Sequence, residues 1–187
     1  MRAFVAVSLP APLVEAIAAL QARMPAGRPV PENNLHLTLA FLGDQPQSVL
    51  EDFHEALASM TAASFPLHLK GLDVMGGAVP KVLCLRADPD PALMALHDRV
   101  RNAARVAGIS LERRRFRPHV TIARFRAGQG AGDGARLRKL LGLGADVAMG
   151  PYKAHSFGLY ESVLMPDRAV HHLLADYPLP DFGNPAG

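Results

Sequence analysis

The chain has no tryptophan, one cysteine and no long apolar run, and each of these absences excludes a class of protein. Cys84 has no partner for an intrachain disulfide, so a small disulfide-stapled scaffold is excluded. The best candidate for a membrane span, Leu13 to Leu20, is interrupted by Glu15 and is far shorter than the roughly 18 apolar residues required. The apolar run before Pro10 is too short for the core of a signal peptide. We therefore expect a cytoplasmic protein with no membrane contact and a buried, reduced Cys84.

Length and composition favour one compact globular domain. The chain has 187 residues, of which 49% are hydrophobic and 20% charged, the usual balance for a soluble fold. We expect a single domain over residues 1–181 and a C-terminal tail at 182–187. A monomer is the default expectation.

Hydrophobic periodicity predicts interleaved strands and helices. Strands are predicted at 3–9, 35–42, 65–85 (a hairpin), 120–125 and 157–164, with a last element at 170–174; helices are predicted at 13–24, 49–57, 93–107 and 137–141. Several strands are joined by turns too short for parallel pairing, so the predicted class is α+β with largely antiparallel sheets. The Gly-rich stretch at 128–135 lacks the features of a phosphate-binding P-loop and is predicted to be a surface loop.

Basic residues cluster between 113 and 126, where six arginines occur without an acid. Such a cluster favours an anionic partner such as phosphate or nucleic acid. The alternative is a solvated arginine-rich loop.

One short motif occurs twice. His36 to Phe41 reads HLTLAF and His119 to Arg124 reads HVTIAR, so both begin His-apolar-Thr-apolar-Ala. Strict strand alternation places His36 with Thr38 on one face, and His119 with Thr121 likewise. The same alternation predicts that Phe41 belongs to the core and that Arg124 points away from His119.

Two imidazoles with two hydroxyls suit chemistry at a phosphorus atom. Histidine transfers protons near neutral pH, and a threonine hydroxyl can hydrogen-bond a non-bridging phosphate oxygen. No metal is needed for that scheme, and histidines without nearby cysteine or His-x₃-His spacing make a poor zinc site. A core has no reason to repeat a polar pair in both halves. The remaining six histidines lack a repeated context and are expected to be surface or structural residues.

Four blocks of the chain, MRAFVAVSLP, PENNLHLTLAFLG, FRPHVTIARF and SFGLYESVL, closely resemble the 2H phosphoesterase superfamily. The resemblance is to its RNA 2′,3′-cyclic phosphodiesterases, also called LigT-type or 2′-5′ RNA ligase-like proteins, and it spans nearly the whole chain. It implies a bilobal α+β fold, with two antiparallel sheets flanked by helices around a central cleft with pseudo-two-fold symmetry. Many relatives carry a tryptophan before the Pro-Glu-Asn block, where this chain has Gly27-Arg28-Pro29-Val30, so recognition of the base or ribose is expected to differ there.

The resemblance implies hydrolysis of a terminal RNA 2′,3′-cyclic phosphate to a 2′-phosphate without a cofactor. His36 would be the acid, His119 the base, and Thr38, Thr121 and Arg124 would bind the phosphate. The reverse reaction, 2′-5′ ligation, stays open, as does hydrolysis of 2′,5′-linked oligonucleotides. A further alternative from another class is a non-catalytic RNA-binding module that uses the arginine cluster.

Overall fold

The computed structural model describes residues 1–181 apart from 26, 77–79, 126–140, 143 and 167–168. Its elements are, in chain order, β1 (Arg2–Ser8), α1 (Ala11–Gln21), β2 (Arg28–Pro29), the 3₁₀ turn η1 (Glu32–Asn34), β3 (His36–Asp44), α2 (Gln47–Ala58), β4 (Phe65–Met75), β5 (Val82–Ala87), α3 (Pro91–Val106), β6 (His119–Arg124), β7 (Ala148–Ala154), β8 (Ser156–Leu164) and β9 (Ala169–Pro178). The α+β class is confirmed. The loop predicted at 128–135, the helix predicted at 137–141 (except its last residue) and the tail at 182–187 lie outside the described residues.

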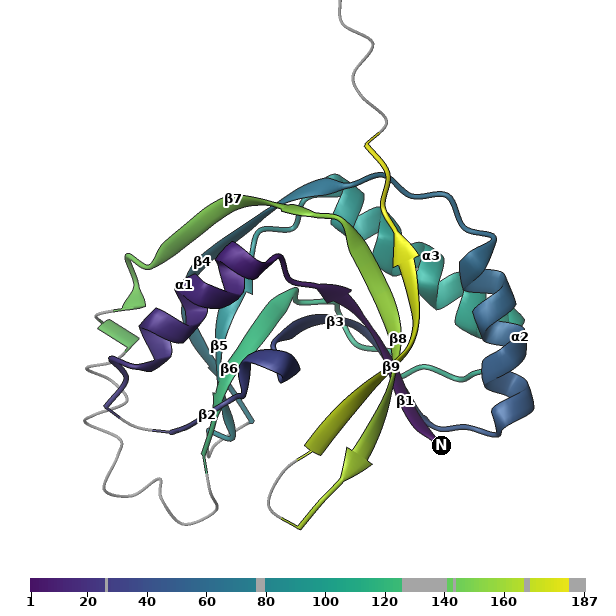
Figure 1. The fold of residues 1–187 in the computed structure, drawn as a ribbon, viewed down its shortest axis with the longest axis horizontal. Coiled ribbons are helices and arrows are strands. Elements are labelled where there is room, and N and C mark those ends of the chain that lie inside the picture. The colour runs from purple at the N-terminus through teal and green to yellow at the C-terminus, as the bar shows by residue number, and fades with distance from the viewer. Residues whose placement is uncertain (26, 77–79, 126–140, 143, 167–168, 182–187) are drawn as a thin grey trace, which may run out of the picture.

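The strands form one antiparallel sheet in the order β7-β4-β5-β6-β3-β1-β8-β9, with β2 paired to β6 (Figure 1). The two expected sheets are the two halves of this sheet, β7-β4-β5-β6 with β2 and β3-β1-β8-β9. They meet at β3 and β6, which pair at a single position, Leu37 with Val120. The halves do not follow the order of the chain, because β8 and β9 join β1 and β3 while β4, β5 and β7 join β6.

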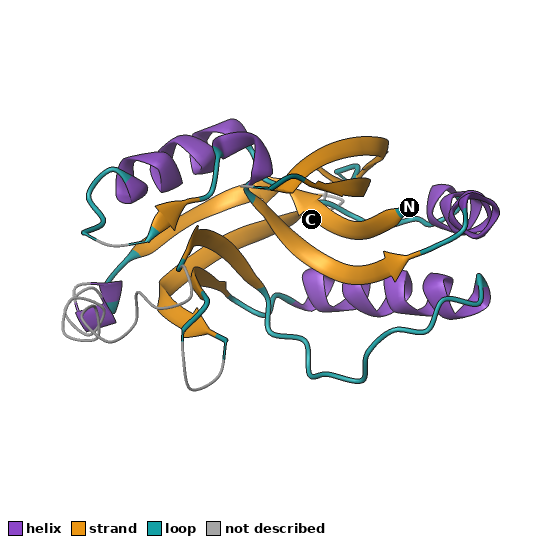
Figure 2. Ribbon diagram, turned by 90° about the horizontal axis from the view of Figure 1, so that it is seen from below, coloured by secondary structure: helices purple, strands orange, loops and turns teal. Residues whose placement is uncertain are grey.

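The helices are exchanged between the two halves. Helix α1 precedes β3 in sequence but contacts β6 and β7, whereas α3 precedes β6 and contacts β3. Helix α2 packs on α3 and β9. Figure 2 shows α1 at one end of the sheet and α2 with α3 at the other. Each copy of the repeated order of helix, loop and His-x-Thr strand thus packs its helix on the half of the sheet that holds the other copy's strand.

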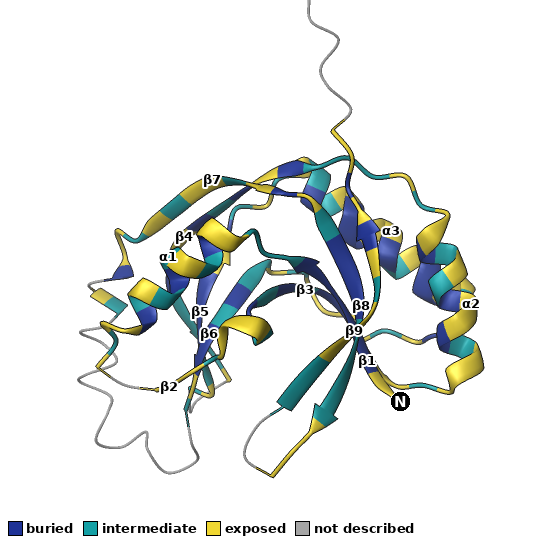
Figure 3. Cartoon of the chain, in the orientation of Figure 1, coloured by how far each residue is buried: buried dark blue, intermediate teal, exposed yellow. Residues whose placement is uncertain are grey.

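The core lies between the sheet and these helices (Figure 3). Leu37 and Val120, which join the two halves, are both fully buried, as are Leu13 and Ile17 on the inner face of α1. Burying a side chain of this size contributes about 1.5–3 kcal/mol. The junction of the halves therefore lies in the core. The buried pair Leu37 and Val120 anchors the polar residues that precede and follow each of them in sequence.

Three further features bear on the expectations. Strand β7 is missing from the sequence prediction, because its mostly exposed residues do not alternate and Pro151 is tolerated only at a sheet edge. Cys84 is buried and free, as expected, and burial raises the pKa of its thiol to about 12. Among the described residues, no helix has the length and apolar character to cross a membrane.

Candidate functional site

Strand β3 breaks its alternation directly after Thr38. The next two residues, Leu39 and Ala40, are both buried. The register against β1 shifts at the same point, since Thr38 pairs with Ala6 while Ala40 pairs with Val5. Leu39 is therefore the extra residue of a β-bulge, which turns Ala40 to the buried face and brings Phe41 to the face of His36.

Strand β6 has the same irregularity after Thr121. Ile122 and Ala123 are both buried, and the register against β5 shifts between Leu83 and Cys84. The six residues from His119 have the same order of buried, half-buried and exposed positions as the six from His36. The internal repeat thus extends beyond the sequence motif to a matching backbone bulge.

The bulges overturn two expectations drawn from strict alternation. Phe41 is not in the core; its side chain is 69% exposed. Arg124 does not point away from the site, because the bulge before it reverses the alternation. Its side chain lines a cavity together with His171, whose ring contacts His36. Both residues occupy the same place in the repeat, three residues after the threonine.

Each motif histidine is oriented by the same backbone hydrogen bond. Nδ1 of His36 lies 2.7 Å from the carbonyl oxygen of Asn34, and Nδ1 of His119 lies 2.7 Å from that of Arg117. A carbonyl oxygen can only accept, so Nδ1 carries the proton in both rings. In the neutral form Nε2 is then an acceptor available to a ligand, and in the protonated form it is a donor.

The junction of the two halves brings the motifs together. Leu37 pairs with Val120 in antiparallel register, so extension by one residue each way sets His36 opposite Thr121 and Thr38 opposite His119. All four are half-buried, and they alternate with the buried pair. The structure therefore places the four sequence-predicted residues on one face at the centre of the sheet.

His36 lies among aromatic rings. Its ring centroid is 4.8 Å from that of Phe4, 6.5 Å from that of Tyr160 and 5.1 Å from that of His171. The pKa of His36 is lowered from 6.5 to about 4, mainly by burial and then by the neighbouring His171, with smaller contributions from Arg124 and His119. The bond to Asn34 opposes this shift. In the free protein His36 is therefore neutral at pH 7.

A cavity of about 460 Å³ opens beside Phe4 and His171, the rings that pack against His36. It is formed by residues near the ends of five strands, namely Arg2, Ala3, Phe4, Phe41, Gly43, Arg124, Ser162, Leu164, Met165, Pro166, Ala169 and His171. Its volume is in the range of small-molecule sites. Arg124 also lines a smaller cavity with Pro29 and Asn34, so its side chain contacts two cavities.

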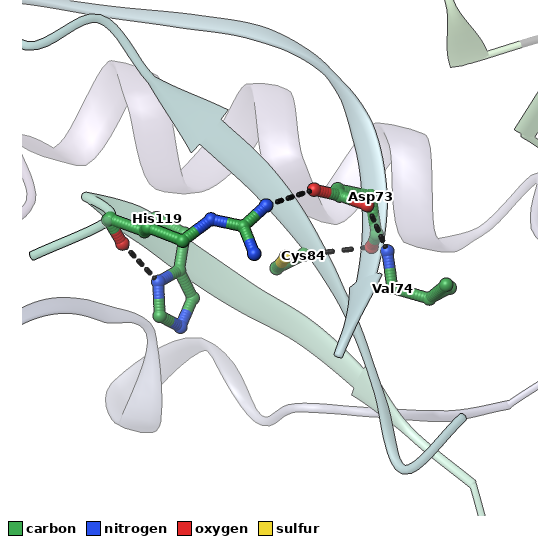
Figure 4. A network of polar contacts seen from close by, with 5 residues as sticks. Asp73, Val74, Cys84 and His119 are labelled. Atoms are coloured by element: carbon green, nitrogen blue, oxygen red, sulfur yellow. Dashed lines mark hydrogen bonds and ion pairs between the residues drawn. The ribbon is translucent and has the colours of Figure 1, made fainter. Parts of the chain in front are cut away.

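A separate polar network supports His119 (Figure 4). Asp73 on β4 accepts a hydrogen bond from Arg117 at 3.1 Å, and the Arg117 carbonyl in turn orients His119. Cys84 donates its thiol proton to the Asp73 carbonyl oxygen, with the atoms 3.4 Å apart. The two histidines therefore have different surroundings, aromatic for His36 and ionic for His119.

Two residues that the sequence did not single out hold the motifs in place. Gln21 is buried at the end of α1 and donates through Nε2 to the carbonyl oxygens of Val30 and Ile122, both at 2.8 Å. It thereby fixes the bulge of β6. Asn34 donates through Nδ2 to the Ala169 carbonyl and accepts from His36 through its own. Neither has a local sequence signal, because their partners lie far away along the chain or on the backbone.

The other histidines and arginines behave mostly as expected. His54 bonds the hydroxyl of Tyr177 and His97 stacks on Phe116, so both are structural. His171 is the exception, since it contacts His36. Of the arginine cluster, Arg124 lines the cavity and Arg117 pairs with Asp73, while Arg126 lies outside the described residues. In the part of the chain that the structure describes, no three His, Cys, Asp or Glu side chains gather as metal ligands would.

Comparison with known proteins gives consistent matches. The family model of the 2′-5′ RNA ligase superfamily matches residues 9–147. The chain is 31% identical over 147 residues to an RNA 2′,3′-cyclic phosphodiesterase of Aeropyrum pernix, covering 78% of this chain and 82% of that protein. It is 35% identical over 144 residues to one of Geobacillus stearothermophilus, covering 73% of this chain but only 46% of that protein, so it spans about half the length of that relative.

Solved structures agree with the sequence matches. The chain superposes on E. coli LigT in its apo form with a TM-score of 0.75 and 27% identity, covering 96% of this chain and 98% of that one. For the protein TT0787 of Thermus thermophilus the TM-score is 0.77, the identity 26%, and the coverage 98% and 100%. The expected bilobal fold and the resemblance are confirmed. The chain belongs to the 2′-5′ RNA ligase superfamily.

Proposed function

We propose that this protein is an RNA 2′,3′-cyclic phosphodiesterase that opens a terminal cyclic phosphate to a 2′-phosphate by metal-independent acid–base catalysis. One observation carries the proposal: two His-x-Thr segments with the same bulge and the same Nδ1 bond present two Nε2 atoms on one face. The names of the relatives support the same substrate class.

In the proposed reaction, one histidine accepts a proton through Nε2 from a water molecule as the water oxygen attacks phosphorus. The bond from phosphorus to O3′ breaks, and the other histidine donates its Nε2 proton to that oxygen. The products are a 2′-phosphate and a 3′-hydroxyl. Thr38 and Thr121 donate hydroxyl hydrogens to the non-bridging oxygens, and Arg124 balances the charge that develops.

The division of roles depends on the charge of His36. The family resemblance assigns His36 as the acid and His119 as the base. The lowered pKa of His36 favours its neutral form in the free protein. An adjacent phosphate anion favours imidazolium and raises that pKa. We therefore propose that His36 takes up its proton with the substrate.

The proposal is tested with a short RNA that ends in a 2′,3′-cyclic phosphate, incubated in EDTA, with 2′- and 3′-phosphate products resolved. We expect the wild type to form the 2′-phosphate, and His36→Ala or His119→Ala to lower the rate by about 10²–10⁴-fold. His155→Ala is the matched control, because His155 is exposed and outside the site.

Three outcomes would contradict the proposal. Activity that disappears in EDTA would contradict metal independence. Turnover of 2′,5′-linked oligonucleotides and not of cyclic phosphate ends would show that the substrate class is the 2′,5′-linked one. No turnover, with RNA binding that weakens as salt rises and survives both histidine substitutions, would indicate a binding module.

A further inference from the structure

His171 lies on β9 and faces the site from the side of His36. In the β8–β9 pairing it stands opposite Ser162. Its ring meets Phe4 and His36 edge to face, with centroid distances of 4.8 and 5.1 Å. These contacts fix the ring in the wall of the cavity that Arg124 also lines.

The two ring nitrogens of His171 are in different positions. Nδ1 is buried and has no hydrogen-bond partner among the described residues. A neutral imidazole carries one proton, and a buried N–H without an acceptor is costly, so the proton belongs on Nε2. His171 therefore presents a donor, whereas neutral His36 and His119 present acceptors.

A buried polar atom without a partner destabilises a fold by roughly 1–3 kcal/mol, and such atoms often mark function. A phenylalanine would fill the same space against Phe4 without this cost. The presence of histidine at 171 is thus not explained by packing.

The cavity around His171 has the character of an anion site. Arg2 and Arg124 are its charged lining residues, Ser162 adds a hydroxyl, and no acid lines it among the described residues. Exposed Phe41, Leu164 and Met165 surround these groups. Cationic and apolar groups together are typical of sites for single-stranded nucleic acid.

The cavity is also displaced from the reacting centre. Of the motif residues it is lined by Phe41 and Arg124, and not by Thr38, Thr121 or His119. His36 does not line it either, but Phe4 and His171, which pack against His36, do, so the cavity adjoins the two motifs on the side of His171. An occupant of this cavity would therefore lie next to the group that is held between the two motifs.

We propose that this cavity binds the phosphodiester group that precedes the cyclic end of the RNA, with the Nε2–H of His171 donating to a phosphate oxygen and Arg2 balancing its charge. The inference rests on the proposed function. It deepens that function by defining the substrate as an oligonucleotide end, in preference to a free nucleoside 2′,3′-cyclic phosphate.

The experiment compares two substrates, a dinucleotide that ends in a 2′,3′-cyclic phosphate and a nucleoside 2′,3′-cyclic phosphate that has no second phosphate. Three variants are used. His171→Phe keeps the ring and removes the donor, His171→Gln keeps an N–H donor near the position of Nε2, and His172→Ala is the matched control on the exposed opposite face of β9.

We expect the wild type to prefer the dinucleotide. His171→Phe should lower this preference in kcat/KM by about 10- to 100-fold, the range for a hydrogen bond to a charged group, through KM and not kcat. His171→Gln should restore part of it, and His172→Ala should keep the wild-type preference. A thermal melt of His171→Phe should show no loss of stability, which separates binding from folding.

An unchanged preference in His171→Phe would overturn the inference. An equal loss on both substrates would also overturn it, because His171 would then act on the reacting phosphate. Wild-type protein that hydrolyses neither substrate would instead refute the proposed function.

Discussion

The lowered pKa of His36 makes a prediction about stability that needs no substrate. The unfolded chain protonates this ring near its ordinary pKa of 6.5, whereas the folded chain does so only at about 4. Between these values the unfolded state binds more protons, so stability falls as pH falls. The contribution is complete above pH 6.5 and is lost by about pH 4.

The size of the effect follows from the shift. One pKa unit corresponds to about 1.4 kcal/mol, so the full window from 6.5 to about 4 is worth about 3 kcal/mol. Between pH 7 and pH 5 the expected loss from His36 alone is about 2 kcal/mol. The pKa values of His97 and His171 are also lowered, chiefly by burial, so their contributions have the same sign.

The assay is urea unfolding followed by circular dichroism at pH 7 and pH 5, for the wild type and for His36→Gln. His97 and His171 are present in both proteins, so their contributions cancel in the comparison. We expect the variant to lose about 2 kcal/mol less than the wild type between the two pH values. Equal losses would refute the account that burial and neighbouring positive charge lower the pKa of His36.

Two further predictions concern the reaction and the bulge. If the substrate anion raises the pKa of His36, the pH limb of kcat that requires protonated His36 lies at higher pH than the corresponding limb of kcat/KM; coincident limbs would contradict this. Leu39→Ala should lower the free energy of unfolding by about 2–5 kcal/mol, because Leu39 is buried in the bulge, whereas Phe41→Ala should change it by about 0.5 kcal/mol or less. Urea unfolding at pH 7 checks both variants. If Phe41→Ala lowered the free energy of unfolding more than Leu39→Ala, Phe41 would belong to the core and the strand would alternate without a bulge.

The elements and the four motif residues could be predicted because their signals are local. Alternation and helical spacing identify most strands and all three long helices, and the repeated His-x-Thr singles out both strands. Strict alternation of side chains along a strand could not predict which face Phe41 and Arg124 occupy. The signal was nevertheless present: each motif continues with two apolar residues, Leu39-Ala40 and Ile122-Ala123, and a repeated break in alternation indicates a repeated bulge.

Residues that reach the site through contacts between distant parts of the chain have no local sequence signal. His171 reaches the site because β9 pairs with β8 and β8 with β1, so its neighbours Phe4 and His36 lie more than a hundred residues away in sequence. Gln21 reaches β6 because α1 covers the opposite half of the sheet. Periodicity predicts which face of an element is buried, but not which element covers it.

The repeat also explains why its two histidines are not equivalent. The matched bulges and Nδ1 bonds give His36 and His119 the same orientation within their strands, so the motif itself cannot assign one as acid and the other as base. The difference comes from the surroundings: Phe4, Tyr160 and His171 enclose His36, whereas the Arg117–Asp73 pair supports His119. Phe41 and Arg124, at equivalent places in the repeat, both line the cavity on the His36 side. A symmetric centre could bind a cyclic phosphate in either direction, so we propose that this one-sided cavity selects a single orientation of the RNA strand.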